Sequence, residues 1–223
     1  MTFSAPFSRV ITKPFGGVPA TSSAWWLSGG IAAANCIVAY TAKGAGSYAL
    51  SKVNLANPGT YDLADGATYP TWNTATGWGF SSTKVLTSNF TAKGTNKAYS
   101  IIARIDELID DITSNTYFGT QGSSLDSLNL IRGFSTQKLQ WNSSGYFIKA
   151  DATKSGNVVM AISGNNPYLD GNDLGTISNA NAIANDGLRV GSSGTFTFVA
   201  GAIYDTAITP TQVGLLTTAL YAL

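Results

Sequence analysis

Apolar and polar residues alternate most clearly near the C-terminal end of the chain. Residues 194–205 carry apolar side chains at both parities: Phe196, Phe198, Ala200, Ala202 and Tyr204 on one, Val199 and Ile203 on the other. A strand with one face in water would keep its apolar residues on a single parity. The segment therefore predicts a central strand covered on both faces, with the even-numbered residues sharing one face.

A helix is predicted shortly after this strand. Thr209 supplies a hydroxyl for the N-cap, Pro210 takes the first helical position, and Gln212 stands three residues after the cap. The apolar positions that follow have helical spacing: Val213, Leu216 and Leu220. The sequence is expected to end in a short amphipathic helix.

The strongest alternation in the middle of the chain lies in residues 98–106 and predicts a second long strand. A helix over residues 101–112 competes, because the isoleucines and leucines there also fit helical spacing. We favour a strand followed by a short loop or helical turn at 107–112, since a β pattern resumes at residues 117–119.

Further strands are predicted where short apolar runs lie between turn sequences rich in Asn, Gly and Ser. They cover residues 128–134, 138–141, 146–150 and 157–163, and the last is expected to form a hairpin with Tyr168 and Leu169. Strands recurring about every 8 to 14 residues are typical of a sandwich or jelly roll. We predict an all-β, two-sheet antiparallel jelly-roll sandwich with a short C-terminal helix.

The length of 223 residues suits one large β domain, which we place at residues 24–223. Residues 1–23 are rich in Pro, Gly, Ser and Thr and predict an extended N-terminal arm. The scattered aromatics Phe3, Phe7 and Phe15 would pin this arm to its own domain or to a neighbouring subunit.

Charge is sparse: 13 basic and 12 acidic residues give a net charge of +1, and charged residues make up 11% of the chain. Nucleic acid and anionic membrane surfaces both recruit clustered Lys and Arg, so we expect neither as a partner. The single Cys36 excludes an internal disulfide and is expected to be buried. We find no secretion signal and no apolar run of about 20 residues, the length a membrane span needs.

Missing residue types argue against an enzyme. The chain has no histidine, which removes Ser-His-Asp and Cys-His catalysis. Glu107 is the only glutamate, and the adjacent Asp110 and Asp111 would point to opposite sides of a strand. A glycosidase needs two carboxylates aimed into one cleft, which only aspartates could supply here. We predict a protein that is not an enzyme, and keep an aspartate-only glycan hydrolase as an alternative.

Several segments, taken in order, resemble the concanavalin A-like lectin and glucanase superfamily in its laminin-G-like form, as found in bacteriophage virion proteins. They are residues 35–40 (NCIVAY) with 43–45, 54–59 (NLANPG), 77–80 (GWGF), 99–104 (YSIIAR), and 201–205 (GAIYD) leading into 208–210. Together they cover about residues 25–223. The resemblance implies two curved antiparallel sheets packed face to face.

The same resemblance implies recognition of glycans or proteins, often with Ca²⁺. Enzymes of the superfamily carry a Glu-x-Asp-x-Glu motif, which a chain with one glutamate lacks. We therefore predict a virion structural protein, either a capsid decoration or a tail or receptor-binding module, made in the host cytoplasm. Its expected partners are other virion proteins or further copies of itself, and a surface glycan. The alternative is a soluble extracellular lectin, with or without Ca²⁺.

Sugar binding needs an exposed aromatic face flanked by amide or carboxylate groups. One predicted hairpin and its following loop concentrate such groups: Asn165, Asn166, Tyr168, Asp170, Asn172 and Asp173. Turn chemistry explains the same asparagines without a ligand. Asp170, Asp173 and Asp186 are candidate oxygen ligands for Ca²⁺, although their spacing matches no calcium-loop signature.

A second candidate patch consists of four aromatic residues: Trp25, Trp26, Tyr69 and Trp72. Large aromatics usually anchor the core or a sheet edge of such sandwiches, and we expect that role here. An exposed member would instead mark an intersubunit contact or a glycan platform.

Overall fold

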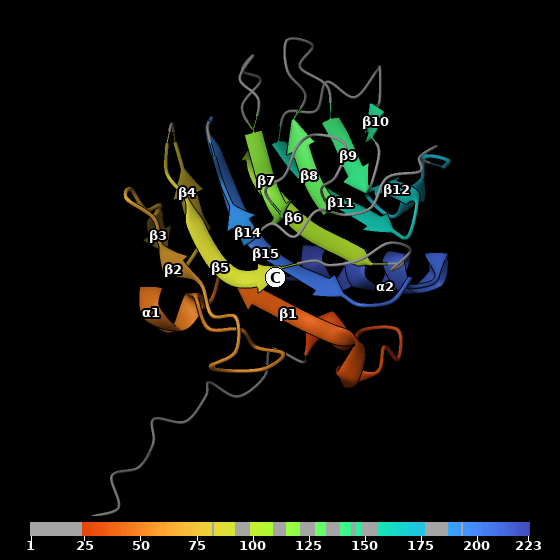
Figure 1. The fold of residues 1–223 in the computed structure, drawn as a ribbon, viewed down its shortest axis with the longest axis horizontal. Helices are drawn as coiled ribbons and strands as arrows, with labels where there is room; N and C mark the ends of the chain where they lie inside the picture. Colours follow the sequence, from red (N-terminus) through yellow and green to blue (C-terminus); the bar gives the residue numbers. More distant parts are fainter. Residues whose placement is uncertain are drawn as a thin grey trace, which may run out of the picture.

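The computed structural model describes residues 24–81, 83–91, 99–108, 115–120, 128–132, 139–143, 146–148, 156–176, 187–192 and 194–223. Within these ranges, antiparallel strands form two sheets that face each other (Figure 1). The predicted arm at residues 1–23 lies outside the described residues, as do residues 109–112 of the loop or turn predicted at 107–112, whereas residues 107 and 108 belong to a strand.

The first sheet has the strand order β13-β12-β11-β6-β15-β4-β3, and β1 pairs with β15 beside β4. Its strands are β1 (Cys36–Thr41), β3 (Thr71–Asn73), β4 (Gly77–Phe80), β6 (Ser100–Leu108), β11 (Gly156–Ser163), β12 (Asn166–Leu169), β13 (Asn172–Asp173) and β15 (Phe196–Tyr204). β15 is thus the central strand, since β6 pairs along one side of it and β4 and β1 share the other.

The second sheet has the order β10-β9-β8-β7-β14-β5-β2. Its strands are β2 (Ala64–Asp65), β5 (Leu86–Thr91), β7 (Asn115–Thr120), β8 (Leu128–Arg132), β9 (Leu139–Ser143), β10 (Tyr146–Ile148) and β14 (Gly187–Val190). The described helical segments are η1 (Trp25–Leu27), η2 (Ala33–Asn35), α1 (Tyr48–Ser51) and α2 (Pro210–Tyr221).

This architecture confirms the predicted two-sheet antiparallel jelly roll with a short C-terminal helix. β6 confirms the long mid-chain strand and runs two residues past its predicted end at Asp106, so the competing helix does not form over residues 101–108. β11 and β12 form the predicted hairpin. The structure also confirms the helix start, because Thr209 and Gln212 cap each other's backbone in a capping box.

Every residue of β15 is buried, as predicted for a strand covered on both faces. The predicted division between the faces is wrong, however, because a β-bulge shifts the register between Phe198 and Ala200. Phe196 and Phe198 pack between the sheets, whereas Ala200, Ala202 and Tyr204 join the cluster on the outer side. The bulge reverses the parity, so an uninterrupted alternation places the second half of the strand on the wrong face.

Helix α2 and segment η1 cover the outer side of the first sheet. Val213, Leu216 and Leu220 of α2 pack with Trp25 against apolar side chains of β6, β11 and β15. This layer buries the outer face, which explains why the central strands carry apolar residues at both parities. No helix in the described part of the chain is long and apolar enough to cross a membrane.

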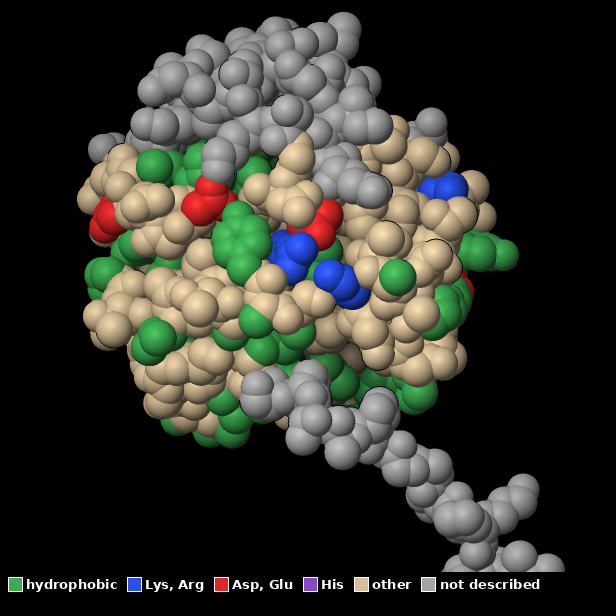
Figure 2. Space-filling model, turned by 180° about the vertical axis from the view of Figure 1, so that it is seen from behind, with side chains coloured by type: hydrophobic (Ala, Val, Ile, Leu, Met, Phe, Trp, Pro, Cys, Tyr) green, Lys and Arg blue, Asp and Glu red, His purple; other side chains and the backbone are tan. Residues whose placement is uncertain are grey.

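One face of the molecule is largely uncharged (Figure 2). Figure 2 shows scattered Lys, Arg, Asp and Glu side chains among larger areas of uncharged polar and hydrophobic ones. Cys36 is buried, as predicted, and burial, with a smaller effect from the Asp205 charge, raises the pKa of its thiol to about 12. The thiol is therefore protonated at neutral pH and unreactive.

Candidate functional site

The predicted hairpin site lies at the β13 edge of the first sheet. Ser163 pairs with Asn166, so Gly164 and Asn165 form the turn between β11 and β12. β13 folds back onto β12 and places Asp173 opposite Tyr168. The structure thus brings the predicted residues of this hairpin together.

Most of their polar groups bind one another or the local backbone. Asn166 Nδ2 donates to Asp173 Oδ2 at 3.3 Å, and Asp173 Oδ1 accepts from the Gly175 backbone N–H at 2.8 Å. Asn172 Nδ2 donates to the Leu169 carbonyl oxygen at 3.3 Å. Turn chemistry therefore accounts for these side chains, and ligand binding by them stays a prediction.

Tyr168 does not present an open aromatic face, because only 2% of the residue is exposed. Its ring packs in the cluster beneath α2. Burial raises the pKa of its hydroxyl, and Asp173 raises it further through its charge and a hydrogen bond. A sugar stacking at this edge would need another aromatic ring.

Asp170 fastens the hairpin to α2. It has a left-handed backbone with φ 51°, and its Oδ1 accepts from the Val159 N–H at 3.0 Å and the Tyr221 hydroxyl at 2.7 Å. Asp186, the third proposed Ca²⁺ ligand, lies outside the described residues. Among those described, no three His, Cys, Asp or Glu residues gather as a metal site.

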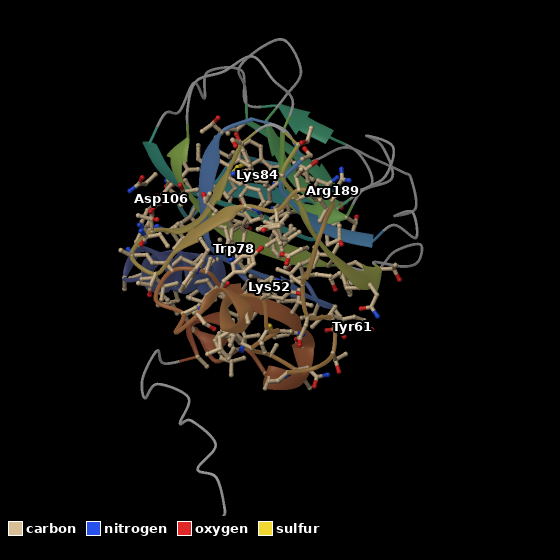
Figure 3. All side chains as sticks on the ribbon, turned by 90° about the vertical axis from the view of Figure 1, so that its left-hand side faces the viewer. Lys52, Tyr61, Trp78, Lys84, Asp106 and Arg189 are labelled. Atoms are coloured by element: carbon tan, nitrogen blue, oxygen red, sulfur yellow. The ribbon has the colours of Figure 1, made fainter. Side chains whose placement is uncertain are left out.

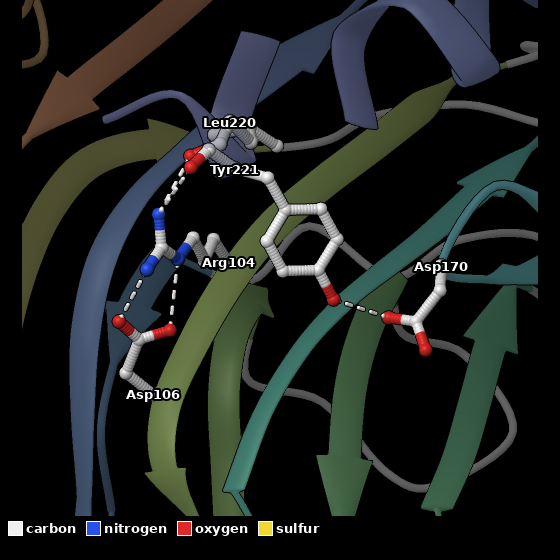
Figure 4. A network of polar contacts seen from close by, with 5 residues as sticks. All are labelled: Arg104, Asp106, Asp170, Leu220 and Tyr221. Carbon is white, nitrogen blue, oxygen red and sulfur yellow. Dashed lines mark hydrogen bonds and ion pairs between the residues drawn. The ribbon is translucent and has the colours of Figure 1, made fainter. Parts of the chain in front are cut away.

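Arg104 extends this contact into a network at the C-terminal end of α2 (Figure 4). Its Nε and Nη2 donate to the two carboxylate oxygens of Asp106 at 2.8 and 2.7 Å, and its Nη1 donates to the Leu220 carbonyl at 2.9 Å. The guanidinium also lies 5.5 Å from the centroid of the Tyr221 ring. A cation bonded to the last helical carbonyls stabilises that end of the helix, so this network has a structural role.

The second predicted patch divides into buried and exposed members. Trp25 is 2% exposed, and Trp26 and Trp72 are partly buried against the core, which confirms the expected anchoring role for these three. Tyr69, in contrast, is 59% exposed. Core packing therefore does not account for Tyr69, which lies on the surface.

Tyr69 belongs to a cluster of four side chains, which we call the Tyr48–Tyr69 surface: Tyr48, Lys52, Asp65 and Tyr69. The two tyrosine rings have centroids 6.1 Å apart and planes inclined by 38°. Lys52 Nζ lies 4.4 Å from the Tyr48 ring centroid and 2.8 Å from Asp65 Oδ2, and the Tyr48 hydroxyl donates to Asp65 Oδ1. Two aromatic rings, an ammonium and a carboxylate thus meet on one surface.

Local structure explains how this surface is held. Ser47 caps α1 by accepting from the Leu50 N–H, which places Tyr48 and Lys52 one turn apart at the two ends of the short helix. Asp65 comes from β2, which pairs with β5 at the edge of the second sheet. Sequence reasoning named Tyr69 and missed the other three residues, because two separate elements bring them together.

The charges on this surface stabilise each other. Partial burial alone would raise the pKa of Asp65, but hydrogen bonds from Lys52 and Tyr48 and the Lys52 charge hold that pKa below its usual 3.8. Burial, followed by the hydrogen bond to Asp65, raises the pKa of Tyr48. At neutral pH Asp65 is therefore ionised and the Tyr48 phenol is neutral.

Acidification is expected to break these contacts only under strongly acidic conditions. Because the folded pKa of Asp65 lies below 3.8, the carboxylate's contribution is complete above that value and is lost as pH falls through the lower folded pKa. An NMR titration of the Tyr48 ring should show a transition below pH 3.8, absent in Asp65→Asn. A midpoint above 3.8 in the wild-type protein would contradict the described ion pair.

Comparison with known proteins yields structural neighbours alone. No protein-family model matches the chain, and neither does any curated protein sequence. The receptor-binding domain of a botulinum neurotoxin shares its fold. The crystal structure of the serotype D binding domain superposes with a TM-score of 0.61 at 12% identity, covering 83% of this chain and 52% of that one.

Sialidase structures from Trypanosoma rangeli match as well. The complex with sialic acid gives a TM-score of 0.53 at 11% identity, covering 82% of this chain and 33% of that one. The covalent intermediate with a difluorosialic acid gives 0.57 at 11% identity, with coverage of 90% and 35%. The chain therefore spans about half or less of these proteins, and the likeness shows a shared β-sandwich fold.

Proposed function

We propose that the chain is a carbohydrate-recognition domain whose saccharide platform is the Tyr48–Tyr69 surface. The observation that carries this proposal is the exposed Tyr69 ring beside Tyr48, with Lys52 and Asp65 bonded to each other at the same place. Sugar rings stack their C–H faces on aromatic side chains, and their hydroxyls bond to carboxylates and ammonium groups. The shared fold with a toxin receptor-binding domain supports a recognition role.

Replacing Tyr69 with alanine is expected to weaken saccharide binding about two- to tenfold, since a stacking contact on an aromatic ring is worth about 0.5–1.5 kcal/mol. A glycan array would first identify a bound saccharide, and calorimetry would then compare the wild-type protein with Tyr69→Ala. Leu215→Ala serves as the control, because Leu215 is also exposed, at 47%, but lies on α2.

Equal binding by Tyr69→Ala, or an array without any bound glycan, would overturn the proposal. The array is run with and without Ca²⁺, which tests the proposed metal dependence separately. Loss of binding in chelator would support a Ca²⁺ site, with Asp170 and Asp173 as the first residues to replace.

We further propose that the domain has no catalytic activity. The chain has no histidine and one glutamate, and Asp106 and Asp170 are already engaged by Arg104 and by Tyr221. Two of the structural neighbours described above are sialidases, so the proposal is tested with a sialidase assay, which measures the release of sialic acid from a sialoside. Product formation that disappears in an Asp→Asn variant would contradict this part of the proposal.

The proposed biological setting is a bacteriophage virion, where the domain would decorate a capsid or form part of a tail and associate with other virion proteins or its own copies. The sparse charge and the sequence resemblance support this setting. Analytical ultracentrifugation and co-purification with particles test it. A strict monomer that never associates with particles would contradict it and would favour the alternative of a soluble lectin.

A further inference from the structure

A row of outward-facing residues crosses four neighbouring strands of the second sheet. Arg189 on β14 lies opposite Thr87 on β5 and Gly119 on β7, and Gly119 lies opposite Asn129 on β8. The sequence neighbours of Arg189 and Asn129 pack into the core, so these two side chains point away from it. We call Thr87, Arg189, Gly119 and Asn129 the outer row.

Two polar atoms of the outer row are buried without a partner. Asn129 is 3% exposed, and its Oδ1 has no hydrogen-bond donor; the Nε of Arg189 likewise has no acceptor. Desolvation by burial lowers the pKa of Arg189, and no described carboxylate forms an ion pair with it. Native proteins rarely leave such groups unsatisfied, because each costs free energy.

Gly119 allows the Asn129 side chain to lie directly against the backbone of β7. A Cβ at this position would lie 2.2 Å from Asn129 Oδ1 and 2.3 Å from the Leu128 carbonyl oxygen, so the amide oxygen occupies the place that a side chain at position 119 would take. Adjacent strands lie about 4.8 Å apart, so the strands bearing Arg189 and Asn129 are about 10 Å apart. Figure 3 shows Arg189 toward the periphery of the sandwich, in contrast to the interior Trp78.

We infer that the outer row is a second binding site, distinct from the Tyr48–Tyr69 surface, for an acidic saccharide. The planar guanidinium of Arg189 suits a sugar carboxylate, which it binds through two parallel hydrogen bonds. Asn129 Oδ1 accepts from a sugar hydroxyl or acetamido N–H, and Thr87 adds a hydroxyl at the other end. Such a ligand supplies hydrogen-bond partners to both Arg189 Nε and Asn129 Oδ1.

The test uses two tetrasaccharides that share acetamido groups and differ in charge: hyaluronan, which carries carboxylates, and chitin, which carries none. Calorimetry is expected to detect hyaluronan, at least about tenfold weaker binding by Arg189→Leu and by Asn129→Leu, and no change in Tyr69→Ala. Equal affinity for both saccharides, absence of hyaluronan binding, or unchanged binding by Arg189→Leu would overturn the inference. Because Tyr69→Ala affects the other surface alone, the two sites can fail independently.

A stability measurement separates a binding role from a structural one. If Arg189 has no partner in the free protein because its partner is a ligand, the guanidinium is an unpaired charge that destabilises the fold. Arg189→Leu should then raise the melting temperature of the free protein by about 2–4 °C. Lys84→Leu is the charge-matched control, and its melting temperature should stay within about 1 °C of the wild type. A fall for Arg189→Leu would indicate that the arginine is paired within the chain and would overturn the inference.

Discussion

Replacing Asn54 with alanine is expected to destabilise the fold by about 3–5 kcal/mol, since several buried backbone groups lose their partners at once. The Asn54 side chain is fully buried. Its Oδ1 accepts from the N–H groups of Ala39 and Ala56 at 3.0 and 3.1 Å. Its Nδ2 donates to the carbonyls of Ile37 and Thr60 at 2.9 and 2.8 Å.

The effect is large because this one amide provides hydrogen-bond partners for the edge of β1 that does not pair with another strand. β15 forms hydrogen bonds with one edge of β1. The other edge of β1 bonds to Asn54 and to the Leu55 N–H, which donates to the Ala39 carbonyl at 2.8 Å. Chemical denaturation of Asn54→Ala measures the loss. The exposed Asn57→Ala is the matched control, expected to change stability by about 0.5 kcal/mol or less. Equal midpoints for the two variants would contradict the described network.

Truncating Phe198 to alanine is expected to cost about 3–5 kcal/mol, the usual range for a fully buried aromatic. Phe198 has no exposed surface, stacks on Trp78 at 5.2 Å between centroids, and lies 5.5 Å from the Phe118 centroid. Thermal or chemical unfolding of the variant measures the cost. A loss below about 1 kcal/mol would indicate that the ring does not fill the space between the sheets.

A double-mutant cycle tests the bulge that sets this geometry. A Cβ added at Gly201 would lie 2.9 Å from Phe198 Cζ, because the bulge turns Gly201 to the same interior face as Phe198. Gly201→Ala alone should therefore cost about 1–3 kcal/mol by overpacking. In a Phe198→Leu background, Gly201→Ala should cost less stability than it does in the wild-type protein, so the two substitutions show a favourable coupling energy. Strictly additive losses would contradict the described facing of the two residues.

Local signals in the sequence predicted the elements of the fold well. The Thr209-Pro210 helix start, the 157–163 hairpin strand and the long strand near 98–106 all form as expected, since each depends on neighbouring residues. The facing of β15 beyond Phe198 could not be predicted, because a bulge is set by pairing with β6 across the sheet. The role of Asn54 was hidden for the same reason, as its partners come from β1 and a loop.

The candidate sites depended even more on tertiary contacts. Dense Asn and Asp residues drew attention to the 165–173 hairpin, yet most of their polar groups bond to the local backbone or to α2. Tyr48, Lys52 and Asp65 are unremarkable in sequence and meet only because α1 packs beside β2. The outer row could not be predicted either, because Arg189, Gly119 and Asn129 come from three strands that are far apart in the sequence and meet only in the sheet.

The central claim, that a saccharide binds at the Tyr48–Tyr69 surface, is tested most directly by mapping a bound glycan with NMR. The protein is titrated with the saccharide that the array selects, and the ring resonances of Tyr48 and Tyr69 are followed together with those of Tyr221, which is also exposed. We predict saturable shifts for Tyr48 and Tyr69 and none for Tyr221. Shifts confined to Tyr221 and the 165–173 hairpin would contradict the account and return the site to the β13 edge of the first sheet.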